Sequence, residues 1–138
     1  MKARYGLIIG MLSLLIALTG CRQLMDIKVS GNVNEGVFFT LYEYGTSDIL
    51  VDEVVVEIRV SIVEDDLPRT IWLLEGRAAL TNIKYGKEYN GFITRHMAGK
   101  LSEGNVYQIN IYIVGDGGTI EGGKRFILEK DGSVRESG

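Results

Sequence analysis

The only cysteine and the only histidine of this 138-residue chain are the first side chains to consider as carriers of chemistry. Cys21 follows a long uncharged run, and His96 lies far from it, next to Arg95. Nucleophilic catalysis needs a base beside the nucleophile, and a zinc ion in a protein needs several nitrogen or sulfur ligands. His96 lies next to a positive charge at the end of an expected strand, which does not favour a catalytic base, and one histidine with one cysteine gives too few ligands for zinc. The sequence therefore predicts no catalytic residue and no zinc site, and we interpret His96 as a surface histidine.

Two acidic stretches raise the question of a calcium site, since carboxylate oxygens are the ligands that calcium prefers. Glu64-Asp65-Asp66 has the spacing of no known calcium loop, and adjacent side chains of an extended chain diverge. We interpret it, like Asp116-Gly117-Gly118, as a solvated turn. The glycines at 115–118 form no phosphate loop, because no helix is expected after them to present its amide groups. We therefore expect no metal and no cofactor, and the sequence predicts a protein that is not an enzyme.

The segment before Cys21 has the pattern of a signal peptide. The first four residues carry two positive charges, and residues 6–18 carry none. An apolar run of this length suits a signal peptide, whereas a membrane-spanning helix needs about 20 residues. The small residues Thr19 and Gly20 then precede Cys21. We expect residues 1–20 to form a helical signal peptide that is cleaved between Gly20 and Cys21.

Leu18-Thr19-Gly20-Cys21 resembles the lipobox of bacterial lipoproteins, with a leucine, two small residues and a cysteine in order. The resemblance implies that the Cys21 thiol receives a diacylglycerol and that the new amino terminus receives an acyl chain such as palmitate. Arg22 stands where an aspartate marks inner-membrane retention in enterobacteria, which implies the outer membrane, with the domain facing the periplasm. An uncleaved membrane anchor and an ordinary secretory signal are the alternatives.

The rest of the chain is long enough for one domain with its own core. Residues 21–24 would form the lipidated cysteine and a short tether, and residues 25–138 the domain. Cleavage removes two of the 15 basic residues and none of the 18 acidic ones, so the formal net charge changes from −3 to −5. This charge argues against nucleic acid as a partner. Lipidation of Cys21 would leave no thiol for a disulfide.

Alternation of apolar and polar residues predicts an all-β domain. In residues 53–63 one face is expected to hold Val54, Val56, Ile58, Val60 and Ile62. Further strands are expected over residues 25–29, 37–44, 70–74, 78–85, 89–94, 107–114 and 119–128, and residues 133–138 are expected to be a frayed tail. Seven or eight short strands separated by glycine turns favour an antiparallel β-sandwich.

One stretch narrows the kind of sandwich. Leu101 lies six residues before Tyr107, which opens a strand, and Gly104 lies between them. This spacing resembles the tyrosine corner of fibronectin type III and related immunoglobulin-like sandwiches, where the tyrosine hydroxyl bonds to the backbone upstream. Glu103 and Asn105 depart from the usual motif. The alternative is a tyrosine that simply starts a strand after a glycine turn.

Binding residues favour loops on a rigid scaffold and exposed tyrosines. The candidate loops are residues 45–52 and 97–105, and the candidate tyrosines are Tyr42, Tyr44, Tyr85, Tyr89 and Tyr112.

These observations favour a lipid-anchored, non-catalytic envelope protein that binds another protein as an accessory or structural component. One alternative is a module that binds a glycan or small ligand, with Trp72 or a tyrosine stacking on sugar rings. Another is a periplasmic inhibitor or immunity protein.

Overall fold

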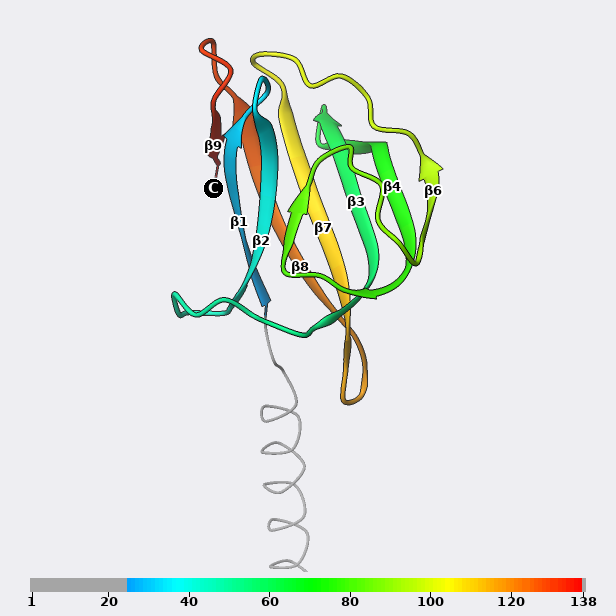
Figure 1. Ribbon diagram of the computed structural model, residues 1–138. Helices are drawn as coiled ribbons and strands as arrows, with labels where there is room; N and C mark the ends of the chain where they lie inside the picture. Colours follow the sequence, from blue (N-terminus) through cyan, green and yellow to red (C-terminus); the bar gives the residue numbers. More distant parts are fainter. Residues whose placement is uncertain (1–24, 138) are drawn as a thin grey trace, which may run out of the picture.

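The computed structural model describes residues 25–137, and they form an all-β domain (Figure 1). The predicted signal peptide, the cleavage site at Gly20 and Cys21 lie outside the described residues. The strands are β1 (Met25–Asn32), β2 (Gly36–Glu43), β3 (Val54–Glu64), β4 (Leu67–Ala79), β5 (Asn82–Lys84), β6 (Phe92–His96), β7 (Val106–Gly115), β8 (Gly118–Leu128) and β9 (Val134–Glu136).

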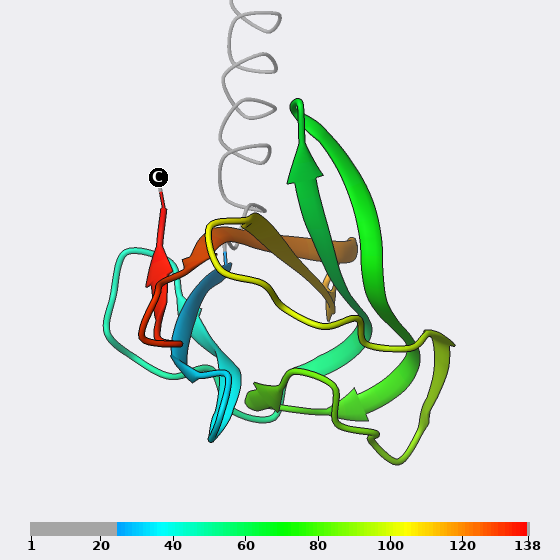
Figure 2. The ribbon, with the colours of Figure 1, turned by 90° about the horizontal axis from the view of Figure 1, so that it is seen from above.

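The strands form two antiparallel sheets, one with the order β1-β2-β5 and one with the order β6-β4-β3-β7-β8-β9. The sheets face one another, as the view along the strands shows (Figure 2). The predicted antiparallel β-sandwich is therefore confirmed. Among the described residues the strands number nine instead of seven or eight, because part of the expected tail forms the three-residue strand β9. The first, second and fifth strands share one sheet and the third and seventh the other, which agrees with an immunoglobulin-like arrangement.

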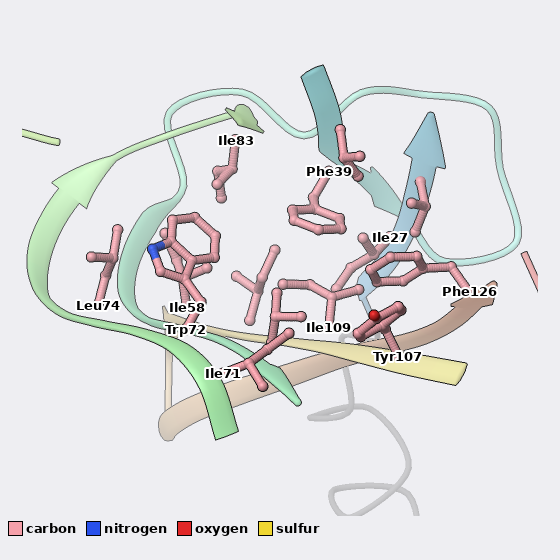
Figure 3. Packing of buried hydrophobic residues seen from close by; sticks show 14 of the residues in the cluster. Ile27, Phe39, Ile58, Ile71, Trp72, Leu74, Ile83, Tyr107, Ile109 and Phe126 are labelled. Atoms are coloured by element: carbon pink, nitrogen blue, oxygen red, sulfur yellow. The ribbon is translucent and has the colours of Figure 1, made fainter. Parts of the chain in front are cut away.

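Aromatic side chains fill the space between the sheets (Figure 3). Phe39 of β2 lies 5.7 Å, between ring centroids, from Phe126 of β8, and Phe126 stacks on Tyr107 of β7 at 5.4 Å. Trp72 of β4 is 1% exposed. Large aromatic side chains contribute much of the apolar area that a small domain can bury, so these contacts hold the two sheets together.

A bulge in β3 changes the predicted face of this strand. Val55 and Glu57 pair with the adjacent residues Ile113 and Tyr112 of β7, so Val56 is an extra residue in the ladder. An inserted residue reverses which face the preceding side chains occupy. Val55 is therefore fully buried. The prediction that Val54 and Val56 share the inward face of Ile58 was wrong for this reason.

Residues 134–136 form a strand of the sheet instead of part of a frayed tail. β9 pairs with β8, and the backbone N–H of Ser137 donates to the carbonyl of Arg125 at 2.9 Å. Glu136 also accepts a hydrogen bond from the backbone N–H of Val29, at 2.9 Å. The backbone groups at the edge of β8 thus find partners in β9, and a side chain of β9 satisfies an amide of β1.

Tyr107 ties the start of β7 to the loop before it. Its hydroxyl accepts a hydrogen bond from the backbone N–H of Ser102 at 2.7 Å and donates one to the Ser102 carbonyl at 3.3 Å. Gly104 has a φ of 81°, in the left-handed region, and Leu101 is buried. These contacts have the form expected of a tyrosine corner.

The sandwich has two distinct ends. β1 starts at Met25 at one end, and the β1–β2 turn lies at the opposite end (Figure 1). The β3–β4 hairpin also turns at the opposite end, through Asp65 and Asp66, whose φ values of 51° and 60° suit a two-residue hairpin turn. Its tip extends away from the body (Figure 2). Between residues 25 and 137 no helix is long and apolar enough to cross a membrane.

Candidate functional site: a groove at the end opposite Met25

A groove of about 490 Å³ lies at the end of the sandwich opposite Met25. Three separate parts of the chain line it: the β1–β2 turn with the start of β2 (residues 33–37), the pair Lys84 and Tyr85, and residues 99–101. Gly36 has a φ of 130°, which disfavours other residues at this position. It also lies close to Lys84, since a Cβ here would be 2.7 Å from Cε of that flexible side chain. The glycine thus lets the Lys84 side chain pass close to the hairpin.

Tyr85 fixes one wall of the groove. Its hydroxyl donates a hydrogen bond of 2.5 Å to the carbonyl of Gly99, and its ring meets the indole of Trp72 edge-on at 5.1 Å between centroids. Burial raises the pKa of Tyr85 above its ordinary value, so the hydroxyl stays a donor well into the alkaline range. The loop that follows β6 is therefore attached to the end of β5 through one side chain and held by the core.

The groove carries both signs of charge. Lys84 and Lys100 provide two ammonium groups, and Glu35 provides a carboxylate. Oε2 of Glu35 already accepts a hydrogen bond from Asn32 at 3.4 Å. The ammonium of Lys84 lies 5.9 Å from the ring centroid of Phe38, a weak cation–π contact. The two lysines can therefore turn toward a carboxylate brought by a ligand.

The groove does not bring together the groups of a known catalytic mechanism. His96, the only imidazole, is exposed at the end of β6, and its Nδ1 lies 2.9 Å from the carbonyl oxygen of Met97. Among residues 25–137 no group of three or more metal-binding side chains is placed to hold an ion. Asp65 and Asp66 form a hairpin turn, and Asp116 lies in the turn between β7 and β8.

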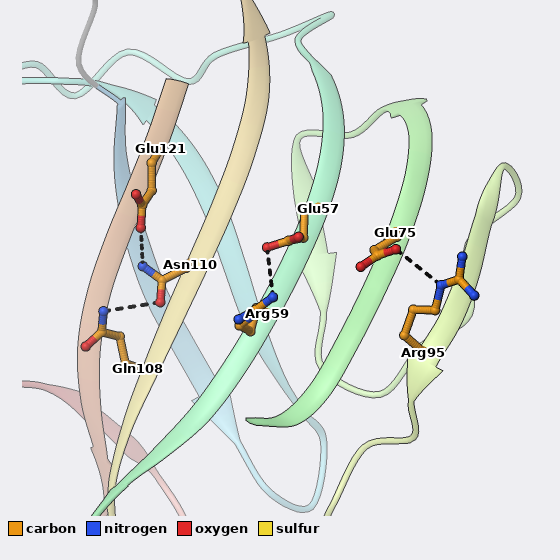
Figure 4. Close-up of polar contacts among 7 residues, drawn as sticks. All are labelled: Glu57, Arg59, Glu75, Arg95, Gln108, Asn110 and Glu121. Carbon is orange, nitrogen blue, oxygen red and sulfur yellow. Dashed lines mark hydrogen bonds and ion pairs between the residues drawn. The ribbon is translucent and has the colours of Figure 1, made fainter. Parts of the chain in front are cut away.

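The outward face of the six-stranded sheet pairs its polar groups with one another (Figure 4). Arg59 lies 3.6 Å from Glu57 on β3, and Arg95 of β6 lies 3.2 Å from Glu75 of β4. On β7, Asn110 accepts a hydrogen bond from Gln108 at 3.2 Å and donates one of 2.8 Å to Glu121 of β8. Most of these groups have partners within the sheet, although Nε of Arg59 is buried without one among the described residues. A ligand on this face would have to displace the others, so the groove is the better candidate.

The candidate aromatic residues have different positions. Trp72 is in the core, so it cannot offer a face to a sugar ring. Tyr85 is partly buried against Trp72, and the hydroxyl of Tyr89 accepts a hydrogen bond from the backbone N–H of Lys84 at 2.8 Å. Tyr44 is 62% exposed, at the Met25 end. The structure therefore does not gather the five candidate tyrosines into one patch.

The loops predicted as binding candidates lie at opposite ends. Residues 97–105 contribute Gly99, Lys100 and Leu101 to the groove, whereas residues 45–52 lie at the Met25 end (Figure 1). Sequence reasoning missed residues 33–37 and Lys84, which complete the groove. In the sequence, residues 33–37 have the pattern of a turn and Lys84 lies at the end of a strand. They lie close together because β2 pairs with β5, which places Lys84 opposite Phe38.

Comparisons of the chain with protein-family models, curated proteins and solved structures found no match.

Proposed function

We propose that this protein is a bacterial lipoprotein that holds a β-sandwich at the periplasmic face of the outer membrane and binds another envelope protein without catalysis. The lipobox at residues 18–21 supports the anchor, with a diacylglycerol and an acyl chain on Cys21. Two or three acyl chains hold a protein firmly on a bilayer, whereas one chain holds it only marginally. An immunoglobulin-like scaffold suits binding, since it presents loops and turns on a rigid framework.

The position of the groove carries this proposal. Met25 opens β1, four residues after Cys21, and the groove lies at the other end of the same sheet. Eight residues of β1 span about 26 Å at the usual rise of a strand. A protein anchored through Cys21 would thus present the groove on the side away from the membrane, where a periplasmic partner can reach it.

The lining favours a peptide segment as the ligand. Lys84 and Lys100, which line the groove, favour an acidic side chain on the partner. The groove is partly open to solvent, which suits a loop or an extended strand of another protein better than a small molecule, whose sites usually enclose most of the ligand.

Glycan binding remains the alternative from another functional class. This alternative needs an exposed aromatic ring to stack on a sugar, but Trp72 is 1% exposed and packs against Tyr85. Among the described tyrosines, Tyr44 still offers an exposed ring, but it lies at the Met25 end, away from the groove. A periplasmic inhibitor or immunity protein is a form of the protein-binding proposal in which the partner is a toxic enzyme.

Site-specific photo-crosslinking in the native envelope tests the proposal. A photoreactive residue is placed at Lys100 in the groove, and a matched one at Lys28, which is exposed on the outward face of β1. We expect one discrete protein adduct from position 100 and none from position 28. The Lys84→Glu variant should weaken the adduct severalfold, because it replaces an attractive charge by a repulsive one, whereas Lys28→Glu should leave it unchanged.

The controls separate the anchor from the binding site. Mass spectrometry of the mature protein should show a diacylated and N-acylated Cys21, and the Cys21→Ser variant should lose both the modification and the adduct. Equal adducts from positions 100 and 28 would contradict binding at the groove. Recovery of peptidoglycan or saccharide, with no protein adduct, would move the glycan alternative ahead.

A further inference from the structure

Three large apolar side chains are exposed at the Met25 end of the sandwich. They belong to the connection between β2 and β3, and their exposed fractions are 62% for Tyr44, 50% for Ile49 and 65% for Val51. The neighbouring Leu50 is packed against the core, and its N–H donates to the Leu41 carbonyl at 3.0 Å, so the connection is fixed to the sheet. Burial of Leu50 turns the side chains beside it outward.

The start of β1 lies beside this connection. Met25 pairs with Glu43, the residue before Tyr44. Cys21 is four residues before Met25, and four residues of chain reach at most about 14 Å. If Cys21 is acylated, the membrane surface must therefore lie within that distance of the residue that faces Glu43.

The β7–β8 hairpin lies at the same end. A Cβ at Gly122 of β8 would lie 2.6 Å from Cε of Met25, so these two residues are neighbours. The turn at Asp116 and Gly117 comes five to six residues earlier, and it reaches roughly 16 to 20 Å beyond Gly122 at the rise of a strand. Residues 44–51 lie to the side of this hairpin (Figure 1), so both reach one surface when the domain tilts toward residues 44–51. The hairpin tip extends somewhat farther from Met25 than Cys21 can. It is polar and suited to the headgroup layer.

We propose that residues 44–51 rest on the membrane that holds the anchor, with Tyr44, Ile49 and Val51 at the boundary between headgroups and acyl chains. This inference rests on the anchor of the proposed function. Tyrosine favours that boundary, because its ring is apolar and its hydroxyl is polar. Three side chains would bind a bilayer weakly alone. The anchor keeps them next to the surface, where weak contacts become effective.

Charge indicates which lipids fit. Residues 43–53 include four acidic side chains, Glu43, Asp48, Asp52 and Glu53, and no basic one. An anionic bilayer would repel them, whereas a zwitterionic headgroup would not. We therefore infer that the contact is made with zwitterionic phospholipid and that anionic lipid weakens it.

Quenching of tryptophan by brominated lipid tests the contact. The full-length acylated protein is placed in phosphatidylcholine vesicles whose acyl chains carry bromine near the headgroup. Trp72 is the only native tryptophan and is buried, so its emission gives a common background. Reporters are introduced as Tyr44→Trp and Val51→Trp. The matched control is Leu67→Trp, since Leu67 is 71% exposed at the far end of the β3–β4 hairpin.

We expect the bromolipid to lower the added emission at least twofold in the Tyr44→Trp and Val51→Trp variants and to leave the Leu67→Trp variant unchanged. Replacing half of the phosphatidylcholine by phosphatidylglycerol should reduce the quenching. Circular dichroism checks that each variant is folded. If one reporter variant is misfolded, the quenching of the other still tests the lipid contact.

The outcomes separate this inference from the anchor. If the protein is acylated and floats with the vesicles but both reporters are quenched no more than the control, the lipid contact is wrong and the anchor stands. If mass spectrometry finds Cys21 unmodified and the protein does not float, the anchor is wrong and the lipid contact is overturned with it.

Discussion

Nζ of Lys124 lies 2.9 Å from Oδ1 of Asp26, and this ion pair joins β8 to β1, two strands of different sheets. The side chains are 24% and 34% exposed, respectively. The hydrogen bond with Asp26 raises the pKa of Lys124, although burial acts in the opposite direction. The pair therefore closes the seam between the sheets near the start of β1.

Replacement of Lys124 by methionine should lower the free energy of unfolding by about 0.5 to 1 kcal/mol, because the pair is partly shielded from water. A folded-state pKa above the unfolded value means that the stabilisation is fully present below about pH 10 and is lost as the pH rises through the folded pKa. Urea unfolding at neutral and at strongly alkaline pH measures both effects. Lys130→Met, in the β8–β9 turn, is the control. An equal loss in the two variants at neutral pH would contradict the role of the pair.

Replacement of Tyr107 by phenylalanine should lower the free energy of unfolding by about 1 to 2 kcal/mol. The variant keeps the ring that stacks on Phe126 and loses the two hydrogen bonds to the Ser102 backbone. The matched control is Tyr112→Phe, on the outward face of the same strand, with an expected change below about 0.5 kcal/mol. Denaturant unfolding compares them. A Tyr107→Phe variant as stable as the control would show that the hydroxyl contributes nothing to this crossover.

Replacement of Gly76 by alanine should destabilise the edge of the large sheet by about 1 to 3 kcal/mol. A Cβ at this position would lie 2.0 Å from the carbonyl oxygen of Gly91, which accepts the N–H of Arg77 at 3.0 Å. Amide hydrogen exchange should accelerate in β6. Gly117→Ala meets nothing within 4 Å and should change neither stability nor exchange. Unchanged protection of β6 in the Gly76→Ala variant would mean that the two backbones separate easily.

Tyr85 should ionise at a higher pH than an exposed tyrosine. Burial raises its pKa first, and the nearby Tyr107 raises it further. Since the unfolded phenol ionises near pH 10, the stability of the fold is unaffected by this group below that pH and falls as the pH rises above it. In a pH titration, phenolate absorbance should show an ionisation step at high pH. The Tyr85→Phe variant should lack this step, and the Tyr42→Phe variant should retain it. If both variants keep the ionisation step at high pH, its assignment to Tyr85 is wrong.

The alternation of residue types was sufficient to predict most strands. β7 alternates regularly and pairs with β8 along their full shared register, and both strands were predicted within two residues of their bounds. β3 was predicted too, but not the face of Val55. A bulge is set by the pairing with β4 and β7, and local sequence does not carry that information. The residues of β9 are polar and short, and only their position beside β8 makes them a strand.

The groove was predictable in part. The loop at residues 97–105 stood out by its length, and Tyr85 was among the candidate tyrosines. Lys84 and residues 33–37 join them through long-range pairing of β2 with β5. In the glycan-binding alternative, Trp72 was expected to stack on sugar rings, yet it lies in the core. A register shift in β4 between Thr70 and Trp72 brings both Ile71 and Trp72 inward.

The pairing of β1 with β2 also has a mechanical consequence. The two strands run antiparallel over eight residue pairs, from Met25 opposite Glu43 to Asn32 opposite Gly36. A pull on the chain at Met25, opposed by a load on Lys84 in the groove, would act along the strands and perpendicular to the hydrogen bonds of this ladder, because Lys84 belongs to β5 and β5 pairs with β2. The bonds would then carry the force together, in shear, instead of opening one after another. A domain held at Met25 and loaded at the groove is therefore connected in the direction in which a β-ladder best resists rupture.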